Sequence, residues 1–217
     1  MKTILSIFVG VIWAIGAYAT CDNDVDMGAN KITTTATTFT NNELVTKAYV
    51  DNHINVGKTD IFTDSGIHEN VPIADVLRTG WSLCYQGTYA DRETMDTILN
   101  ACRQTKLMLS CRRTDSAILQ LLAADTRTHV LFDVGNGREA QHTHNSVAWY
   151  YSGRKSWGFF PAGESVDRHS CDASSPDATN RLCWHTDADS LTSGHRCGDD
   201  VRLNGNVTYE RLIFQHP

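Results

Sequence analysis

The chain has 217 residues, of which 25 are acidic and 19 are basic, so its formal net charge is −6 at pH 7. This negative balance repels phosphate backbones and anionic lipid headgroups, which argues against nucleic acid or a membrane surface as a partner. Whether the seven cysteines form disulfide bonds depends on the compartment in which the protein folds, and the N-terminal sequence indicates that compartment.

Residues 1–19 have the features of a secretory signal peptide. Lys2 supplies the positive charge, an apolar run covers residues 4–16, and residues 17–19 (AYA) match the small-x-small pattern of a cleavage site. The apolar run is shorter than the roughly 20 residues that span a bilayer. An uncleaved anchor and a lipoprotein attached at Cys21 are therefore the weaker alternatives. We predict a secreted, extracellular protein with no membrane insertion after cleavage.

Residues 20–56 are predicted to form a short stem. Residues 30–38 are rich in threonine and alternate weakly, which favours extended chain over helix. Thr40 and Glu43 have the spacing of a capping box, so a helix is expected over about residues 41–54. A helix of this length with few large apolar side chains is marginal alone in water, so it requires a packing partner.

Residues 31–33 (KIT) and 46–51 (TKAYVD) resemble the NKI…TKAYVD segment of phage tail-fibre and related trimeric fibre proteins. In that family an extended strand and a short helix are associated with homotrimeric shafts. The resemblance covers about residues 30–55 and implies that the stem forms a homotrimer. The alternative is a lone surface helix on a monomeric domain.

A polar linker at residues 57–70 is expected to lead into the main domain, residues 71–217. The domain is predicted to be α+β, mainly antiparallel β, with one early helix. Residues 71–77 have the composition of a short helical turn, and Asp91 can cap a longer helix that ends near Cys102. Strand-like apolar runs, separated by turn-forming residues, cover residues 81–86, 107–111, 117–123, 129–134, 147–151, 156–160 and 209–214.

Six cysteines belong to this domain: Cys84, Cys102, Cys111, Cys171, Cys183 and Cys197. An even number in an exported domain predicts three disulfide bonds, each worth about 2–4 kcal/mol of stability. Three of these cysteines lie in the polar segment 167–206, which is expected to be a loop. Cys102 and Cys111 are the expected local pair, so Cys84 would join the three cysteines of the loop. Cys21 is either free or cross-linked between chains.

Two short groups of residues have spacings found in metal sites. His142 and His144 would share one face of an extended chain, as zinc or copper ligands can, but no third ligand is evident and a hydrated loop is the simpler interpretation. Asp187 and Asp189 resemble the start of a calcium loop without the other ligands of an EF-hand. Residues 199–200 keep a looser calcium site open. No other cofactor is predicted.

Aromatic and polar residues of the C-terminal half indicate a sugar-binding surface. Carbohydrate sites combine flat apolar faces for the ring with fixed polar groups for the hydroxyls. The candidates are Trp184, His185, Arg196, Trp149, Asn145 and Arg168. Trp184 is expected to be exposed in the loop, whereas the simpler interpretation of Trp149 is a core position on a strand.

The sequence thus predicts a secreted multivalent binding protein, an adhesin or lectin-like head on a trimeric stem. Linking weakly binding heads raises the effective concentration for the later contacts, which is a physical reason to place a small head on a stem. One alternative is a structural subunit of an extracellular fibre, sheath or coat. The other is a secreted hydrolase, although no Gly-x-Ser-x-Gly motif and no marked pair of carboxylates is present in the sequence.

Overall fold

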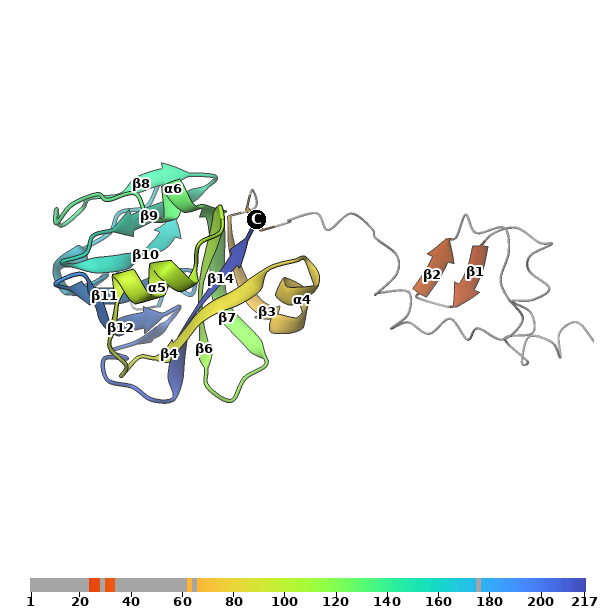
Figure 1. Ribbon diagram of the computed structural model, residues 1–217. Helices are drawn as coiled ribbons and strands as arrows, with labels where there is room; N and C mark the ends of the chain where they lie inside the picture. Colours follow the sequence, from red (N-terminus) through yellow and green to blue (C-terminus); the bar gives the residue numbers. More distant parts are fainter. Residues whose placement is uncertain (1–23, 28–29, 34–61, 64–65, 175–176) are drawn as a thin grey trace, which may run out of the picture. The chain divides into compact units, whose positions relative to one another are not determined.

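The structure, a computed structural model, describes residues 24–27, 30–33, 62–63, 66–174 and 177–217 (Figure 1). The chain divides into two units, Met1–Val56 and Gly57–Pro217. In the first unit, β1 (Asp24–Met27) pairs with β2 (Asn30–Thr33) as an antiparallel hairpin. β2 falls at the start of the segment predicted to be extended. The signal peptide, Cys21 and the predicted stem helix lie outside the described residues.

Two antiparallel sheets form the second unit (Figure 1). The five-stranded sheet has the order β3-β7-β6-β14-β4, and its strands are, in that order, Ile67–Pro72, Ile118–Thr126, Lys106–Arg113, Tyr209–His216 and Ser82–Thr88. The seven-stranded sheet runs β13-β12-β11-β10-β9-β8, formed by Asp200–Val201, Ser190–Cys197, Leu182–Asp187, Ser156–Pro161, Val147–Tyr151 and His142–His144. Its seventh strand, β5 (Glu93–Thr94), also pairs with β12. The prediction of a mainly antiparallel α+β fold is confirmed.

The main hydrophobic core contains large apolar residues from both sheets. The five-stranded sheet contributes Leu107, Leu109, Leu121, Ala123 and Ile213, and the seven-stranded sheet contributes Trp149, Trp157, Phe159, Trp184 and Leu191. The alternate residues of these strands are buried too: Met108 and Leu122 lie in a second apolar cluster, and Tyr150 and Phe160 lie in a third. Because both of their faces are covered, β7, β9 and β10 read as nearly continuous apolar runs.

Three short α-helices lie among the described residues: α4 (Ile73–Arg78), α5 (Met95–Ala101) and α6 (Arg127–Val130). α4 corresponds to the predicted helical turn at residues 71–77. α5 begins later than predicted, because its N-cap is Thr94, whose hydroxyl accepts a hydrogen bond from the Thr97 amide at 3.2 Å. The carboxylate of Asp91 instead accepts a bond from the Thr88 amide at 2.6 Å.

All six cysteines of this unit form disulfide bonds, as predicted, and the pairs are Cys84–Cys102, Cys111–Cys197 and Cys171–Cys183. The predicted local pair of Cys102 with Cys111 is wrong. Cys102 follows α5, which packs against β4, and there it bonds to Cys84. Cys111 is a core residue and bonds across to Cys197 of the other sheet. Three disulfides indicate an oxidising, extracellular environment.

The segments that connect the predicted strands differ from the sequence prediction in three places. Residues 167–206, predicted to be a loop, contain β11 and β12, whose pairing has two register shifts that interrupt the alternation of side chains. Residues 129–134, predicted to be a strand, begin in α6, where the Leu131 amide bonds to the Arg127 carbonyl at 3.0 Å. Residues 67–70 of the predicted linker belong to β3, whose polar residues suit an edge strand.

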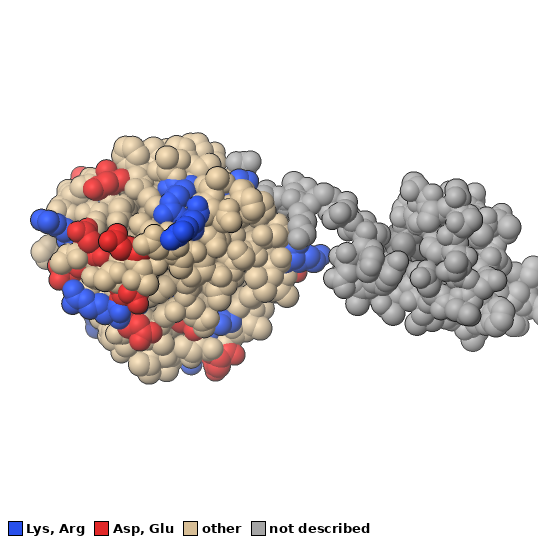
Figure 2. Space-filling view, in the orientation of Figure 1, with Lys and Arg blue, Asp and Glu red and all other residues tan. Residues whose placement is uncertain are grey.

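No helix in the described residues is long and apolar enough to cross a bilayer. On the face drawn in Figure 2, acidic and basic side chains are interspersed, and a broad uncharged area lies beside them. That face therefore lacks the one-sign basic surface that attracts a phosphate backbone.

Candidate ligand-binding site

Trp184 and Trp149, two of the predicted ligand-binding residues, are fully buried in the core. Trp184 lies on β11, where its ring stands perpendicular to that of Trp157 at 5.5 Å between centroids. Its indole N–H donates to the hydroxyl of Tyr89 at 3.2 Å. The expectation that Trp184 is exposed is wrong, because the segment around it is a core strand rather than a loop.

Arg196 and Arg168, also predicted to bind ligand, are buried and bonded to the chain itself. Arg196 donates to three backbone carbonyls at 2.9–3.0 Å, those of Gly198, Ser174 and Ala178. Arg168 donates to the Ser156 hydroxyl at 3.0 Å and to further backbone carbonyls. Burial lowers the pKa of both guanidinium groups. These arginines fasten loops to the seven-stranded sheet.

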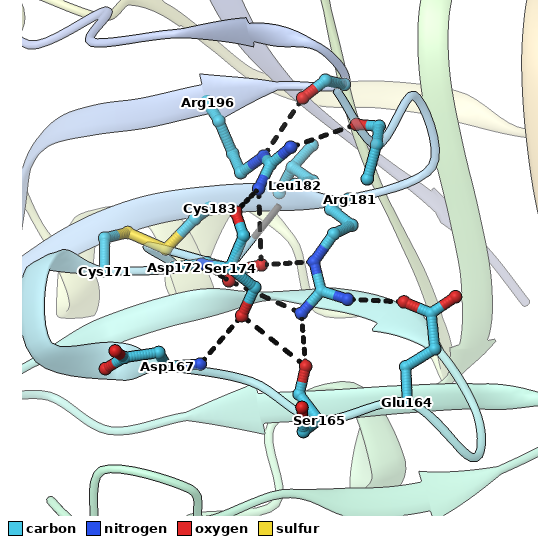
Figure 3. Close-up of polar contacts among 12 residues, drawn as sticks. Glu164, Ser165, Asp167, Cys171, Asp172, Ser174, Arg181, Leu182, Cys183 and Arg196 are labelled. Carbon is cyan, nitrogen blue, oxygen red and sulfur yellow. Dashed lines mark hydrogen bonds and ion pairs between the residues drawn. A yellow bond between two sulfur atoms is a disulfide. The ribbon is translucent and has the colours of Figure 1, made fainter. Parts of the chain in front are cut away.

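Figure 3 shows the carboxylate of Asp172 between the guanidinium groups of Arg181 and Arg196. Its Oδ2 lies 2.8 Å from Arg181 Nε and 4.0 Å from Arg196 Nη1. Arg181 also contacts the exposed carboxylate of Glu164 at 2.6 Å and the carbonyl of Ser165 at 2.8 Å. Next to the Cys171–Cys183 disulfide, Asp172 is thus paired mainly with Arg181, which has Glu164 as a second partner, while backbone carbonyls satisfy most of Arg196.

His185 and Asn145, the remaining predicted ligand residues, are half-buried. His185 lies on β11 with its ring centroid 6.3 Å from that of His195, and burial lowers its pKa. Asn145 forms the turn between β8 and β9 with Ser146, both at positive φ, and its amide donates to the Thr63 carbonyl at 3.0 Å. The six predicted residues thus do not share one surface. The two tryptophans are in the core, the two arginines bind loop carbonyls, and His185 and Asn145 lie on a strand and in a hairpin turn.

The predicted metal candidates fall at two different hairpins. Asp187 ends β11 and Asp189 lies in the turn before β12, and among the described residues they belong to no group of three side chains that could share an ion. His142 and His144 lie on β8, and the structure brings Asp125 and His129 to them. His129 and Asp125 are residues that sequence spacing did not connect to the pair.

Comparison with protein-family models, curated proteins and solved structures found no match for this chain.

Among the described residues, two surface cavities are lined by polar side chains. One, of about 610 Å³, includes Glu139, Gln141 and Arg181, but the guanidinium of Arg181 is already bonded within the network around Asp172. The other, of about 410 Å³, is here called the polar cleft, and its lining residues are Glu69, Asn70, Arg113, Ser116, Ile118, Gln120, Thr179, Asp199, Asp200 and Tyr209. The polar cleft offers the wider range of exposed donors and acceptors.

The walls of the polar cleft come from both sheets. Glu69 lies on β3 and Arg113 ends β6, both in the five-stranded sheet, whereas Asp199 and Asp200 follow β12 of the seven-stranded sheet. The Cys111–Cys197 disulfide joins the sheets two positions before Arg113 and two positions before Asp199. A covalent bond therefore fixes the separation of the two walls.

Asn70, in this cleft, has a left-handed backbone conformation. Its φ is 56°, a region in which asparagine is more common than most residues other than glycine. Its neighbours Glu69 and Val71 pair with Leu121 and Leu119, while Asn70 itself has no strand partner in that register. Asn145 and Asp189 adopt the same region in hairpin turns, so in β3 it marks a local irregularity of the edge strand.

The acidic side chains of the cleft are held in place by hydrogen bonds and still have free acceptor sites. Thr179 donates from its hydroxyl to Glu69 Oε1 at 2.8 Å, and Gln120 donates from its amide to Asp200 Oδ2 at 2.8 Å. A carboxylate offers about four acceptor sites, so each of these groups can accept further hydrogen bonds. Burial and a hydrogen bond with Asp200 raise the pKa of Tyr209, so its phenol stays neutral and is already engaged within the cleft wall.

Proposed function

We propose that this chain is an exported binding protein whose C-terminal domain takes a hydroxyl-rich ligand, such as a glycan, in the polar cleft. The single observation that supports the ligand class is the lining of the cleft. Glu69, Asp199 and Asp200 supply acceptors for hydroxyl groups, while the exposed side chains of Asn70 and Arg113 supply donors. Ile118, 38% exposed, adds apolar surface for the face of a sugar ring.

The proposal includes presentation of several heads on a trimeric stem, as an adhesin or lectin would use. It rests on the resemblance of about residues 30–55 to trimeric fibre proteins. A small polar cleft binds weakly alone, and linking three copies compensates because the later contacts see a high effective concentration. Sedimentation of the mature chain, with and without residues 20–56, tests this part: a trimer that becomes a monomer is expected. A monomer in both cases contradicts it, and open-ended self-assembly favours a fibre or coat subunit.

A secreted glycoside hydrolase is the second candidate. Glu69 and Asp200 line the cleft from strands of different sheets, and glycoside cleavage requires a pair of carboxylates. Release of new reducing ends from a bound oligosaccharide would favour this candidate over simple binding.

A glycan-array screen of the mature protein tests the ligand class, followed by titration of the best ligand against variants. We expect Asp200→Asn and Glu69→Gln to weaken binding about tenfold or more, as loss of a hydrogen bond from a charged acceptor costs about 1.5–3 kcal/mol. Glu139→Gln, in the other cavity, is the matched control and should bind as the wild type does. Loss of binding in Glu139→Gln alone, or no bound glycan at all, would overturn the assignment.

A further inference from the structure

Three histidines and one aspartate gather at the edge strand β8, away from the residues of the polar cleft. His142 and His144 stand two apart on this strand, so their side chains share a face. They pair with Trp149 and Val147, both buried in the main core, which places the two imidazoles on the inner face of the sheet. Figure 1 shows α6 beside β8 at this edge.

His129 and Asp125 reach the same place from the other sheet. β7 ends just after Asp125, and α6 follows at once and carries His129. Val130 of α6 is buried, and its carbonyl accepts a hydrogen bond from the Trp157 indole at 3.1 Å. The short helix is therefore anchored to the core of the seven-stranded sheet, which holds His129 in position.

The ligand-type atoms of this cluster lie close together. His144 Nδ1 is 2.7 Å from Asp125 Oδ2, and the rings of His129 and His144 stack at 3.6 Å between centroids. One such atom each from Asp125, His129 and His144 lies within 4.8 Å of the other two. Ligands of a tetrahedral zinc ion, at about 2.0–2.1 Å from the metal, are about 3.3 Å apart. Because the rings of His129 and His144 are stacked and nearly parallel, one of them would have to turn for both nitrogens to point at one ion together with Asp125.

The surroundings of the cluster favour a cation over three isolated imidazoles. Asp125 is 1% exposed, and a buried carboxylate needs a compensating positive charge. Its Oδ1 accepts a bond from the Thr126 amide at 2.7 Å, which orients Oδ2 toward His144. Two imidazoles stacked at 3.6 Å repel each other when both are protonated, whereas a metal ion binds both in their neutral form.

His142 has a different position from the three other members. Its Nε2 lies 2.7 Å from Nδ1 of His129, and the exposed ring of Phe132 stacks on its other side at 4.3 Å. A hydrogen bond to the far nitrogen of a ligating histidine fixes the tautomer and the orientation of that ring. This contact is what a supporting residue behind a ligand makes.

We propose that Asp125, His129 and His144 bind a first-row divalent transition metal ion, with Zn²⁺ the best fit, and that His142 is a positioning residue for His129. Two imidazoles and one carboxylate suit zinc better than Ca²⁺ or Mg²⁺, which take oxygen ligands. Three protein ligands leave one tetrahedral position for water or for a group from outside. The ion would also join β7, α6 and β8, and thereby tie the two sheets together.

Titration of the mature, chelator-treated protein tests the site. Calorimetry with Zn²⁺ should give one ion per chain, and Co²⁺ should give the strong visible absorption of a four-coordinate ion. The melting temperature should rise with Zn²⁺ concentration, because an ion that binds only the folded state stabilises it by mass action. Ca²⁺ and Mg²⁺ should produce neither effect.

Matched variants assign the ion to these residues. His129→Gln and His144→Gln should abolish the one-to-one binding and the rise in melting temperature, and Asp125→Asn, which keeps the side-chain shape, should do the same. His142→Gln should keep the stoichiometry and weaken affinity about 10–100-fold, as loss of such a supporting partner does. His169→Gln, at an exposed position outside the cluster, should bind as the wild type does.

Three results would overturn the proposal. The first is a titration of the wild type that shows no stoichiometric uptake of Zn²⁺, which would leave Asp125 and His144 as an ordinary ion pair. Unchanged binding in His144→Gln and Asp125→Asn, each with its three disulfides intact by mass spectrometry, would place the ion elsewhere. Unchanged affinity in His142→Gln would remove the positioning role.

Discussion

The network around Asp172 and the polar cleft contain similar side chains and differ in what those side chains contact. Asp172, Arg181 and Arg196 are buried, and each is bonded to charges or carbonyls of the chain itself. Glu69 and Arg113 of the cleft are exposed and make few internal contacts. A buried charge survives only with its partners built in, whereas an exposed charge that is held in place can still accept a ligand. The comparison separates groups that hold the fold from groups that can bind.

The largest effect should come from breaking the buried network at its centre. Asp172→Ala leaves the guanidinium groups of Arg181 and Arg196 without their shared carboxylate, so we expect a loss of about 3–5 kcal/mol in the free energy of unfolding. Urea denaturation measures it. Asp187→Ala, at an exposed position, is the control and should change stability by no more than about 0.5 kcal/mol. Equal losses in the two variants would contradict the structural role of the network.

Trp184→Ala tests whether an aromatic core residue behaves as packing or as a binding residue. The ring is fully buried against Trp157, so truncation should cost about 3–5 kcal/mol of stability. The fraction that remains folded should bind the cleft ligand with unchanged affinity. A stable variant with weakened binding would return Trp184 to the role that the sequence first indicated.

Removing disulfides one at a time sharpens the comparison between cleft and scaffold. Cys111–Cys197 spans 86 residues and Cys84–Cys102 spans 18, so loop entropy predicts that losing the first costs about 1.4 kcal/mol more than losing the second. Double Cys→Ala variants and denaturant titration give the two values. Only the loss of Cys111–Cys197 should also weaken ligand binding, because that bond joins the walls of the cleft. Equal effects on binding would show that the walls are held by other contacts.

The smallest effect concerns an exposed ion pair. Arg138 contacts Asp167 at 2.6–2.7 Å, and this contact holds the pKa of the Asp167 carboxyl well below its usual range. A lowered pKa in the folded state contributes stability above the unfolded pKa of about 3.9, and this contribution is lost as the pH falls further. The free energy of unfolding of the wild type should therefore be slightly higher than that of Asp167→Asn at neutral pH, and this difference should disappear in acid. A difference that does not depend on pH would contradict this assignment.

The sequence predicted those strands whose large apolar residues pack in the core, among them residues 147–151 and 156–160. It did not predict β11 and β12, because polarity ordinarily signals exposure. Arg196 is buried in β12 since backbone carbonyls accept from its guanidinium, and that satisfaction depends on loops distant in sequence. A buried arginine and an exposed one look the same in a sequence.

The candidate sites were less predictable than the fold, since each is assembled by long-range pairing. The spacing of His142 and His144 gave half of the histidine cluster, but Asp125 and His129 join it only through the docking of α6 against β9. The polar cleft depends on the Cys111–Cys197 pairing, and six cysteines allow fifteen pairings. Glu69 and Asn70 fell in the predicted linker, where their polarity carried no sign of a site.

β3 is both a wall of the polar cleft and the first strand after the N-terminal unit. If the proposed stem anchors the chain, tension on a ligand held in the cleft would first reach Phe62 and Thr63, which are buried in the domain, and then the strand that bears Glu69 and Asn70. β3 lies at the edge of its sheet and is hydrogen-bonded to β7 alone among the strands. The Cys111–Cys197 bond starts from β6, two strands away from β3, and would still join the two sheets if β3 detached.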